Sequence, residues 1–495
     1  MSVTNLGEVI DRTSLSEAPW LIEITGSGAA NTYTFDWMHR AVDALAQQLR
    51  QRPLKRGARI GLLALNSAPY LIAYLAIMRA GFVAVPLNFK LTRDTLEYII
   101  QDAEIALLFV DEARQGLFTS LPLVRLEYDS ELPTTATTAA VVSQDMQPEE
   151  IATILYTSGS TGRPKGVPLT HGGYVWVIQT LARVSPPFKN KRALVAAPLY
   201  HMNAVIQCLL TSAMGGTNVM LCQFSAKEYL LAAADYQCDM LTAVPTMFAL
   251  ASRETALLER LDLSHVQTVK SGSAPVTEAL MDRLAEMFPA ASISNWWGTT
   301  ESGPVAFGAH PAGLARPKLA VGFPLPEVEL ELRDGVDVTQ GTLWIRSRAI
   351  TPGYLNLPDE SSKRFTDGWY NTSDVMRRDA QGFYYFVGRI DDMFVCGGEN
   401  IYPGEVERML EKHPAISQAA VLSVADEIKG QIPVAFIVQR EGFSLDAESV
   451  KLFALAHAPA YQHPRFIEFL TEMPLAGTNK IDRHVLKNIA IKFVR

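Results

Sequence analysis

Hydrophobic and polar positions alternate along the first part of the chain in a rhythm of strands and helices. From Arg59 the apolar run IGLLAL is followed by a helical pattern beginning at Ala68, which Ser67 is placed to cap. The apolar runs FVAVPL and IALLFV come next, separated by a second helical pattern after Thr92. This order predicts a β-α-β-α-β unit with parallel strands.

The same alternation returns between Arg192 and Trp297. Its apolar runs are ALVAAP, TNVMLC, DMLTAV, VQTVKS and SISNWW, separated by helical patterns such as VTEALMDRLAEMF. Together the two regions predict an α/β fold with two mostly parallel α/β sheets.

The pattern changes between Gly322 and Phe386, where short β runs with turn residues replace helical periodicity. A β-barrel-like subdomain is expected there. After Arg389 the helix EVERMLEKH is followed by strands AAVLSV and PVAFIVQ, another helix and the strand RFIEFL. We therefore expect a large N-terminal domain over residues 1–389 and a small α+β C-terminal domain over residues 390–495.

Composition agrees with a globular enzyme. The 495 residues are 48% apolar and 19% charged, enough for about three packed units. A net charge of −8 without a basic stripe argues against nucleic-acid partners. Four cysteines without a CxxC pair indicate a reduced, cytoplasmic protein. The N-terminus lacks a signal-peptide core, and the apolar run over residues 205–224 carries polar residues, so no membrane span is expected.

The segment YTSGSTGRPKGVPLT, over residues 156–170, has the chemistry of a phosphate-binding loop. Its glycines allow backbone N–H groups to approach an anion, its hydroxyls donate hydrogen bonds, and Lys165 adds a positive charge. It is not a Walker loop, because Lys165 lies between Pro164 and Gly166 and the segment joins two predicted strands. Composition alone leaves a solvated hairpin loop equally open.

This segment resembles the phosphate-loop signature of the adenylate-forming superfamily, which includes acyl- and aryl-CoA synthetases, nonribosomal peptide adenylation domains and firefly-type luciferases. The resemblance covers nearly the whole chain. It recurs in order at PLYHMNA (198–204), NWWGTTES (295–302), DGWYNTSD (367–374), FVGRIDDMFVCGGENIYPGEVE (386–407) and TNKIDR (478–483).

The resemblance implies an ATP site. Its residues are Thr157, Ser158, Gly159, Ser160, Thr161, Gly162, Lys165, Trp297, Gly298, Thr299, Asp374 and Arg389. Trp297 replaces the family's usual Tyr, so it gains stacking area for adenine and gives up the polar tip of Tyr. Asp374 is implied to bind the ribose hydroxyls, and Arg389 the ribose or phosphates. On residue type alone, Trp297 is a core aromatic and Asp374 caps a turn.

Catalytic roles are likewise implied by the resemblance. Lys480 bridges the acid and the α-phosphate, although Asn479 precedes it where many members have Gly. Thr300 contacts the α-phosphate, and Glu301 with Thr157 holds Mg²⁺. His201 lies at the mouth of the acid pocket, where it orients or gates, with a hydrogen-bonded core histidine as the alternative.

A thiol acceptor is implied by a further group of residues. The CoA-binding residues are Lys90, Gly397, Gly398, Tyr461 and Arg465, with His463 where Lys or Arg is often found. Asp391 matches the hinge about which a mobile C-terminal domain rotates between the two half-reactions.

The pocket for the acid is implied to be lined by His201, Asn203, Ser271, Gly272, Trp296 and Gly303. Gly298 stands where acetyl-CoA synthetases carry Trp, which leaves room for an acid larger than acetate. Lys270 either pairs with a second carboxylate or phenolic oxygen of the acid or points to solvent, and strand alternation favours solvent.

The resemblance therefore implies an ATP-dependent ligase that uses ATP, Mg²⁺ and CoA. It activates an aryl or short to medium acyl carboxylic acid as acyl-AMP with release of pyrophosphate, and then transfers the acyl group to CoA. A free-standing enzyme that loads a carrier protein, a luciferase-like oxygenase and a nucleotide-binding protein without ligase activity are the alternatives. The oligomeric state is open, with a homodimer among the options.

Overall fold

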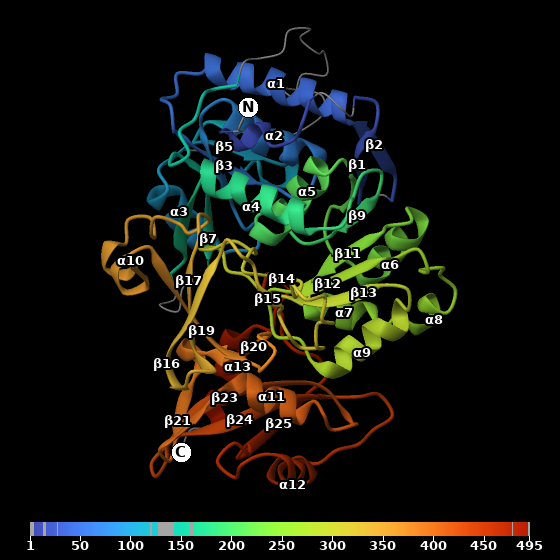
Figure 1. The fold of residues 1–495 in the computed structure, drawn as a ribbon, viewed down its shortest axis with the longest axis vertical. Coiled ribbons are helices and arrows are strands. Elements are labelled where there is room, and N and C mark those ends of the chain that lie inside the picture. Colours follow the sequence, from blue (N-terminus) through green and yellow to red (C-terminus); the bar gives the residue numbers. More distant parts are fainter. Residues whose placement is uncertain are drawn as a thin grey trace.

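The computed structural model describes residues 4–12, 16–26, 28–118, 121–126, 143–157, 163–477 and 479–493. It is an α/β protein whose large N-terminal part contains two mostly parallel sheets and a smaller antiparallel one, with the C-terminal domain below the two parallel sheets in Figure 1. Within the described residues, no helix is both long and apolar enough to cross a membrane.

The first sheet has six strands in the order β6-β5-β3-β4-β7-β8. Its strands are β3 (Arg59–Leu63), β4 (Val83–Pro86), β5 (Ile105–Val110), β6 (Leu123–Arg125), β7 (Ile151–Thr157) and β8 (Lys165–Thr170). Helices α2 (Ala68–Arg79) and α3 (Arg93–Asp102) make the crossovers, and Ser67 and Thr92 accept hydrogen bonds from the first turns as N-caps. The β-α-β-α-β prediction is confirmed.

The second sheet has seven strands in the order β13-β12-β11-β9-β10-β1-β2. Its strands are β1 (Pro19–Ile24), β2 (Ala30–Thr34), β9 (Arg192–Val195), β10 (Thr217–Leu221), β11 (Met240–Ala243), β12 (Thr268–Gly272) and β13 (Ser292–Trp296). The five predicted strands are present and parallel. The N-terminal hairpin β1-β2, which the sequence did not indicate, extends the sheet next to β10.

Helices fill the space between and around the two sheets. They are α1 (Phe35–Gln51), α4 (His171–Val184), α5 (Met202–Ala213), α6 (Ala226–Asp235), α7 (Pro245–Ala251), α8 (Thr255–Leu258) and α9 (Glu278–Met287). Every residue of α2 is buried, and one apolar core joins α2, α4 and α5 to strands of both sheets. The two sheets therefore form one rigid support for the site.

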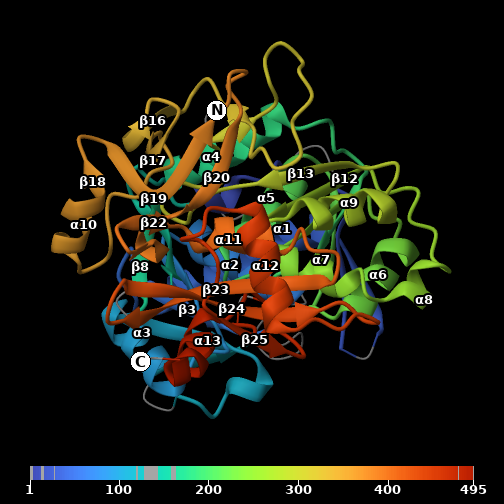
Figure 2. The ribbon, with the colours of Figure 1, turned by 90° about the horizontal axis from the view of Figure 1, so that it is seen from below.

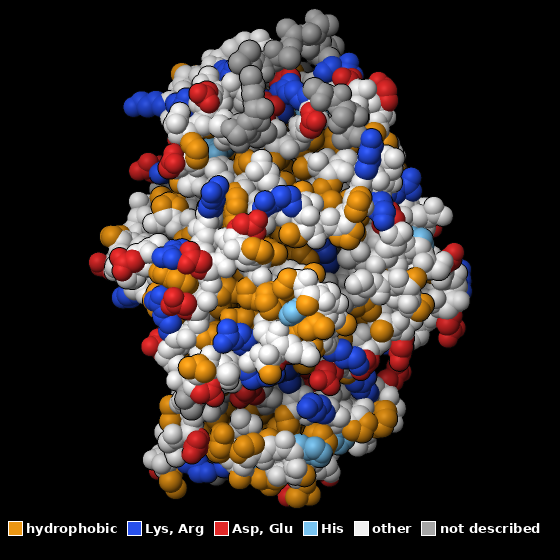
Figure 3. Space-filling view, viewed as in Figure 1, with side chains coloured by type: hydrophobic (Ala, Val, Ile, Leu, Met, Phe, Trp, Pro, Cys, Tyr) orange, Lys and Arg blue, Asp and Glu red, His pale blue; other side chains and the backbone are white. Residues whose placement is uncertain are grey.

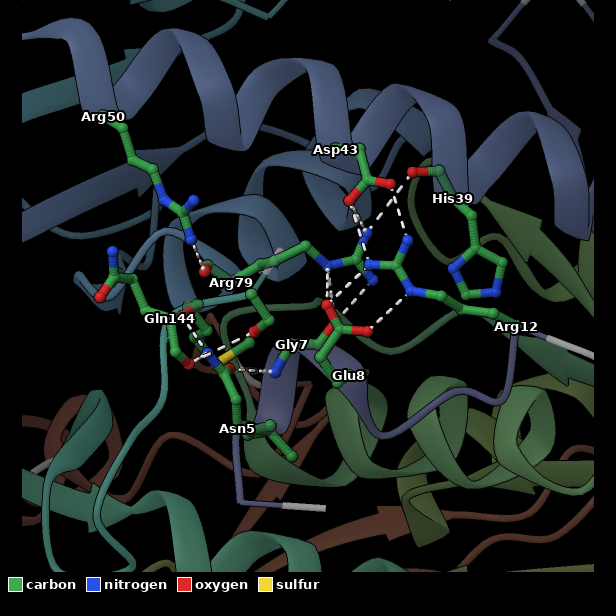
Figure 4. A network of polar contacts seen from close by, with 12 residues as sticks. Asn5, Gly7, Glu8, Arg12, His39, Asp43, Arg50, Arg79 and Gln144 are labelled. Carbon is green, nitrogen blue, oxygen red and sulfur yellow. Dashed lines mark hydrogen bonds and ion pairs between the residues drawn. The ribbon is translucent and has the colours of Figure 1, made fainter. Parts of the chain in front are cut away.

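A buried ionic network fixes the N-terminal segment to this core, as Figure 4 shows. Arg79 at the end of α2 is 1% exposed and pairs with Asp43 at 2.9 Å and Glu8 at 2.7 Å. Arg12 pairs with the same two carboxylates, each at 2.7 Å. Glu8 ends a short 3₁₀ helix (Leu6–Glu8), so the network ties this turn to α1 and α2. Breaking a buried pair of this kind typically costs about 3–5 kcal/mol.

The expected β subdomain is an antiparallel sheet. Its strands are β16 (Glu329–Asp337), β17 (Gln340–Arg346), β18 (Phe365–Thr366), β19 (Trp369–Arg378) and β20 (Tyr384–Arg389). They run in the order β16-β17-β19-β18, and β20 also pairs with β19. A short pair, β14 (Phe307–Gly308) and β15 (Phe323–Pro324), and helix α10 (Pro358–Arg364) flank it.

The C-terminal domain has its own sheet and its own apolar core. Its strands are β21 (Phe394–Cys396), β22 (Glu399–Ile401), β23 (Ile416–Asp426), β24 (Gly430–Gln439) and β25 (Phe466–Leu470), and its helices are α11 (Pro403–Leu410), α12 (Ala447–His457) and α13 (Arg483–Ala490). Figure 2 looks onto this domain, where α11 and α12 lie over the long strands β23 and β24. The predicted α+β elements are confirmed.

Candidate active site

One large cavity, of about 1090 Å³, lies where the C-terminal domain meets the N-terminal domain. It opens at the carboxyl ends of parallel strands, where ligands of α/β proteins bind. The expected residues that line it are Thr157, Lys165, His201, Asn203, Gly272, Trp296, Trp297, Gly298, Thr299, Thr300, Glu301, Asp374, Arg389, Asp391 and Lys480. The tertiary structure thus gathers side chains from all the separate motifs into one site.

The strands that flank the expected phosphate loop form an antiparallel hairpin, in which Thr157 pairs with Lys165. The prediction that the segment joins two strands, unlike a Walker loop, is confirmed. Ser158, Gly159, Ser160, Thr161 and Gly162 lie outside the described residues. The Lys165 ammonium donates to Glu360 at 2.8 Å and lies 5.3 Å from the centre of the Tyr354 ring. Its hydrogen bond is the main reason that the pKa of Glu360 falls to about 2.

The expected metal-binding carboxylate is held by the same tyrosine. Glu301 is 9% exposed, and its Oε1 accepts a hydrogen bond from the Tyr354 hydroxyl at 3.0 Å. Tyr354 therefore contacts both the lysine and the carboxylate of this part of the site. Sequence reasoning did not single it out, because it lies in the segment TPGYLNLP between two recognised motifs.

Asp374 is the centre of a three-residue polar cluster. Its Oδ1 accepts a hydrogen bond from Arg389 at 2.7 Å, and its Oδ2 accepts one from the indole Nε1 of Trp297 at 2.7 Å. Asp374 is only 4% exposed, and burial raises its pKa to about 6 in spite of the opposing effects of Arg389 and Trp297. The expectation that Trp297 gives up the polar contact of a tyrosine is wrong, because its indole N–H supplies another one.

Lys480 reaches the cavity from a turn of the C-terminal domain. Burial lowers the pKa of its ammonium, Arg389 lowers it further, and Asp374 acts in the opposite direction. The charges of Arg389 and Asp374 therefore both act on the Lys480 ammonium.

His201 faces the cavity as a neutral imidazole. Burial, reinforced by Lys480 and Lys90, lowers its pKa to about 3. Its Nε2 is buried and has no hydrogen-bond partner among the described residues. An unpaired buried ring nitrogen is costly unless a ligand pairs with it, so this atom is available to a substrate.

Alternation along β12 decides which side chains enter the acid pocket. Lys270 and Gly272 line the cavity, whereas Ser271 between them is fully buried and does not. The expectation that Lys270 points to solvent is wrong, because its ammonium lies 4.2 Å from the centre of the Trp296 ring. Burial lowers the pKa of Lys270 to about 8, and Arg316 adds to the effect. The expectation that Ser271 lines the pocket is wrong for the same geometric reason.

Two glycines also differ from their expected roles. A Cβ at Gly298 would lie 2.7 Å from Cα of Pro304, so the space beside this glycine is already filled by backbone. Gly303 has φ +68° and faces Val177 and Ala349, and it does not line the cavity. The cavity is also lined by residues that sequence reasoning did not name, including Ile206, Gln207, Leu210, Thr242 and Met247.

Comparison with known proteins agrees with this geometry. The model of the AMP-binding enzyme family matches residues 11–355, and that of the AMP-binding enzyme C-terminal domain matches residues 405–480. The chain belongs to the AMP-binding enzyme family. The two matched regions contain most of the cavity residues, including Lys165, Glu301 and Lys480; the segment with Asp374, Arg389 and Asp391 lies between them, and Arg483, His484 and Lys487 follow the second.

Members of this family resemble the chain along almost its entire length. A feruloyl-CoA synthase from Amycolatopsis sp is 30% identical over 474 residues, covering 94% of this chain and 95% of that protein. A 2-succinylbenzoate–CoA ligase from Bacillus pumilus is 29% identical and covers 92% and 93%. The crystal structure of an anthranilate–CoA ligase in complex with anthranoyl-AMP has a TM-score of 0.87 at 25% identity and covers 98% and 97%.

The expected CoA-binding residues of this family member do not share one site in the described structure. Gly397 and Gly398 have φ +60° and +91° in the β21-β22 turn, and neither lines the cavity. Tyr461 packs against the C-terminal core, and the backbone N–H of Arg465 donates to Pro433. Lys90 belongs to the N-terminal domain. In this orientation of the domains, none of these five residues lines the cavity that Lys480 lines.

Proposed function

We infer that this protein is an ATP-dependent acid–CoA ligase, which converts a carboxylic acid into acyl-AMP and pyrophosphate and then passes the acyl group to the thiol of CoA. The observation that carries this proposal is the single cavity, in which Lys480 from one domain meets Glu301, Asp374 and Arg389 from the other. Relatives that cover nearly the whole chain are CoA ligases, and this supports CoA as the acceptor.

In the first half-reaction the acid carboxylate attacks the α-phosphorus of ATP, and the bond to the pyrophosphate oxygen breaks with its electron pair. Lys480 and Thr300 both line the cavity, and in this proposal the Lys480 ammonium stabilises the charge shared by the carboxylate and the α-phosphate, with Thr300 as a second contact. The acid arrives ionised and needs no base. The neutral His201 has an unpaired ring nitrogen that orients the acid.

The residues present fit a magnesium ion bound largely through phosphates. Glu301 would offer the carboxylate oxygen that does not accept from Tyr354, and Thr157, at the end of β7, lines the same cavity and would add a hydroxyl. The described residues contain no cluster of three or more His, Cys, Asp or Glu side chains that could hold a metal. Mg²⁺ is often held by one or two carboxylates together with substrate phosphates, and it would neutralise phosphate charge here.

The second half-reaction requires a different face of the C-terminal domain. In the proposed rotation about Asp391, Lys480 leaves the cavity and the Gly397–Gly398 turn lines the path of the CoA thiol. On the face shown in Figure 3, charged side chains gather at the level where the two domains meet. A polar junction of this kind separates at lower cost than a fused apolar core.

ATP binding should depend on pH through Asp374. Burial raises the pKa of this carboxyl to about 6, so it becomes protonated as the pH falls through 6 and loses an acceptor for the ribose hydroxyls. We expect the KM for ATP to rise roughly tenfold between pH 7 and pH 5. Steady-state kinetics over this range measures the change. Asp374→Asn serves as the control, because an amide does not titrate in this range. Its KM for ATP should be higher than that of the wild type and should not change between pH 7 and pH 5. If its KM rises with falling pH as the wild-type KM does, Asp374 is not the group that titrates.

The position of Lys270 indicates that the acid carries an oxygen at its far end. A buried ammonium lining the pocket gains most from a second carboxylate or a phenolic oxygen. Lys270→Met keeps the length of the side chain and removes the charge. We expect kcat/KM to fall about 10- to 100-fold for acids that carry this oxygen and to change little for the same acids without it. Equal losses for both members of each pair would refute the pairing.

A pyrophosphate-release screen tests the function directly. Aryl, aliphatic and dicarboxylic acids are each incubated with ATP and Mg²⁺, with and without CoA, and the thioester is identified by mass. We expect one class of acid to release pyrophosphate alone and to form thioester only with CoA. Pyrophosphate release followed by transfer only to an acyl carrier protein, or by oxygen uptake, would replace the CoA assignment.

A further inference from the structure

The turn that carries Lys480 is fixed internally by its own backbone. The Asn479 N–H donates to the carbonyl of Ala476, and the Ala476 N–H donates to the carbonyl of Lys480, at 2.9 and 2.8 Å. Asn479 has φ +57°, a left-handed conformation that asparagine tolerates better than most residues. These bonds shape the turn, but they do not determine where it lies relative to the N-terminal domain.

Two hydroxyls of the N-terminal domain contact this turn on the side that precedes Lys480. The Tyr200 hydroxyl donates to the carbonyl of Gly477 at 3.0 Å. The Thr246 hydroxyl donates to the carbonyl of Asn479, the residue directly before Lys480. Tyr200 directly precedes His201, and Thr246 lies in the first turn of α7, so the donors come from two separate elements.

The tip of the turn also packs closely against the N-terminal domain. A Cβ at Gly477 would lie 3.2 Å from the side-chain amide of Asn88 and 3.2 Å from Cβ of Lys90. A Cβ at this position is closer than ordinary van der Waals contact, so the turn or its neighbours must shift by a few tenths of an ångström. Tyr200 is 4% exposed and lies edge-on against Phe89 at 5.3 Å, so its hydroxyl is held in place by packing.

We propose that Tyr200 and Thr246 are positioning residues that hold the Lys480 turn against the N-terminal domain and thereby set the orientation in which the acid is adenylated. The inference rests on the proposed function, since it presumes that Lys480 acts in the first half-reaction. Donors and acceptors belong to different domains, so both hydrogen bonds must break when the C-terminal domain rotates. The two hydrogen bonds therefore favour one orientation of the domains. They also hold the Lys480 ammonium in position, and a displacement of about 1 Å in such a position costs roughly 100-fold in rate.

Removal of each hydroxyl alone tests the proposal. Tyr200→Phe and Thr246→Val keep the shape of the side chain, and we expect each to slow acyl-AMP formation by roughly 5- to 10-fold, as for one neutral hydrogen bond. Thioester formation from supplied acyl-AMP should be unchanged or faster. Tyr33→Phe and Thr217→Val are matched controls, since they remove hydroxyls that bond to Glu23 and to the carbonyl of Pro19 within the N-terminal domain.

A second kind of variant changes the same contact on the side of the C-terminal domain. Gly477→Ala leaves both hydroxyls intact but crowds Asn88 and Lys90, and it should give the same selective loss of acyl-AMP formation. If Tyr200→Phe, Thr246→Val or Gly477→Ala folds but slows both half-reactions equally, or leaves acyl-AMP formation unchanged, the proposal is overturned.

The Lys480→Ala background separates this proposal from the proposed function. If the hydroxyls act through the ammonium, Tyr200→Phe and Thr246→Val should cause little further loss of acyl-AMP formation once Lys480 is alanine. Full additivity would show that they act on something else. If Lys480→Ala itself retains normal acyl-AMP formation, the assigned role of Lys480 fails first. If it loses that activity while the hydroxyl variants do not, only the present inference fails.

Discussion

Replacement of Lys480 by alanine should lower the rate of acyl-AMP formation by roughly 100-fold or more, and it should leave thioester formation from supplied acyl-AMP close to normal. The reason is the position of the ammonium at the wall of the cavity, in the field of Arg389 and Asp374. A fixed charge aimed at the reacting centre in a buried site contributes most when charge develops in the transition state. Pyrophosphate exchange measures the first half-reaction, and thioester formation from synthetic acyl-AMP measures the second.

A control for general loss of positive charge is Lys492→Ala. Lys492 belongs to the same domain, is half exposed and pairs with Glu468 at 2.8 Å, away from the cavity. It should leave both half-reactions unchanged. If Lys480→Ala slows both steps equally, the lysine does not have the role given to it, and the division of the reaction between two domain orientations loses its main support.

Replacement of Asp391 by proline should have the opposite selectivity. Asp391 lies in the 3₁₀ turn Ile390–Asp392 between the domains, and it pairs with Arg364 at 3.0 Å and with Arg389 at 3.1 Å. A proline fixes φ and restricts the preceding residue, so it opposes the backbone rotation that the second half-reaction requires. We expect thioester formation from supplied acyl-AMP to fall by roughly tenfold or more, while acyl-AMP formation is largely retained.

Asp391→Asn distinguishes stiffness from charge. This variant weakens both ion pairs without restricting the backbone. The domain orientation that contains the Arg364 contact then becomes less favoured. The rate of thioester formation from supplied acyl-AMP should therefore stay the same or increase. Normal thioester formation by Asp391→Pro would exclude rotation about this position. Equal losses in the proline and asparagine variants would assign the effect to the ion pairs.

Local patterns predicted the elements of this fold well, because each depends on neighbouring residues. Ser67 caps the helix that it was expected to cap, a helix follows Thr92 as predicted, and the apolar runs between Arg192 and Trp297 are parallel strands. The N-terminal strand β1 was missed, because it pairs with β10 nearly two hundred residues later in the chain and no local signal marks that partner.

Face and register are the points at which sequence reasoning failed. A shift of one position along β12 exchanges Lys270 for Ser271 as the residue that lines the cavity, and nothing in the string VKSGSAP fixes that choice. Gly298 was read as open space, but the close approach of Pro304 fills it. Both outcomes depend on how the sheet lies against the segment that follows β13.

The sequence by itself determined the alternation of strands and helices from Arg59 and again from Arg192, and which residues form the motifs of the AMP-binding enzyme family, since periodicity and motif spacing are properties of the chain alone. Only the tertiary structure decided that the indole of Trp297 binds Asp374, that Lys270 lines the cavity, and that Tyr200 and Thr246 contact the turn before Lys480. Each of these contacts joins side chains or strands whose relative orientation is set by packing across the whole core, and short-range patterns contain no information about it.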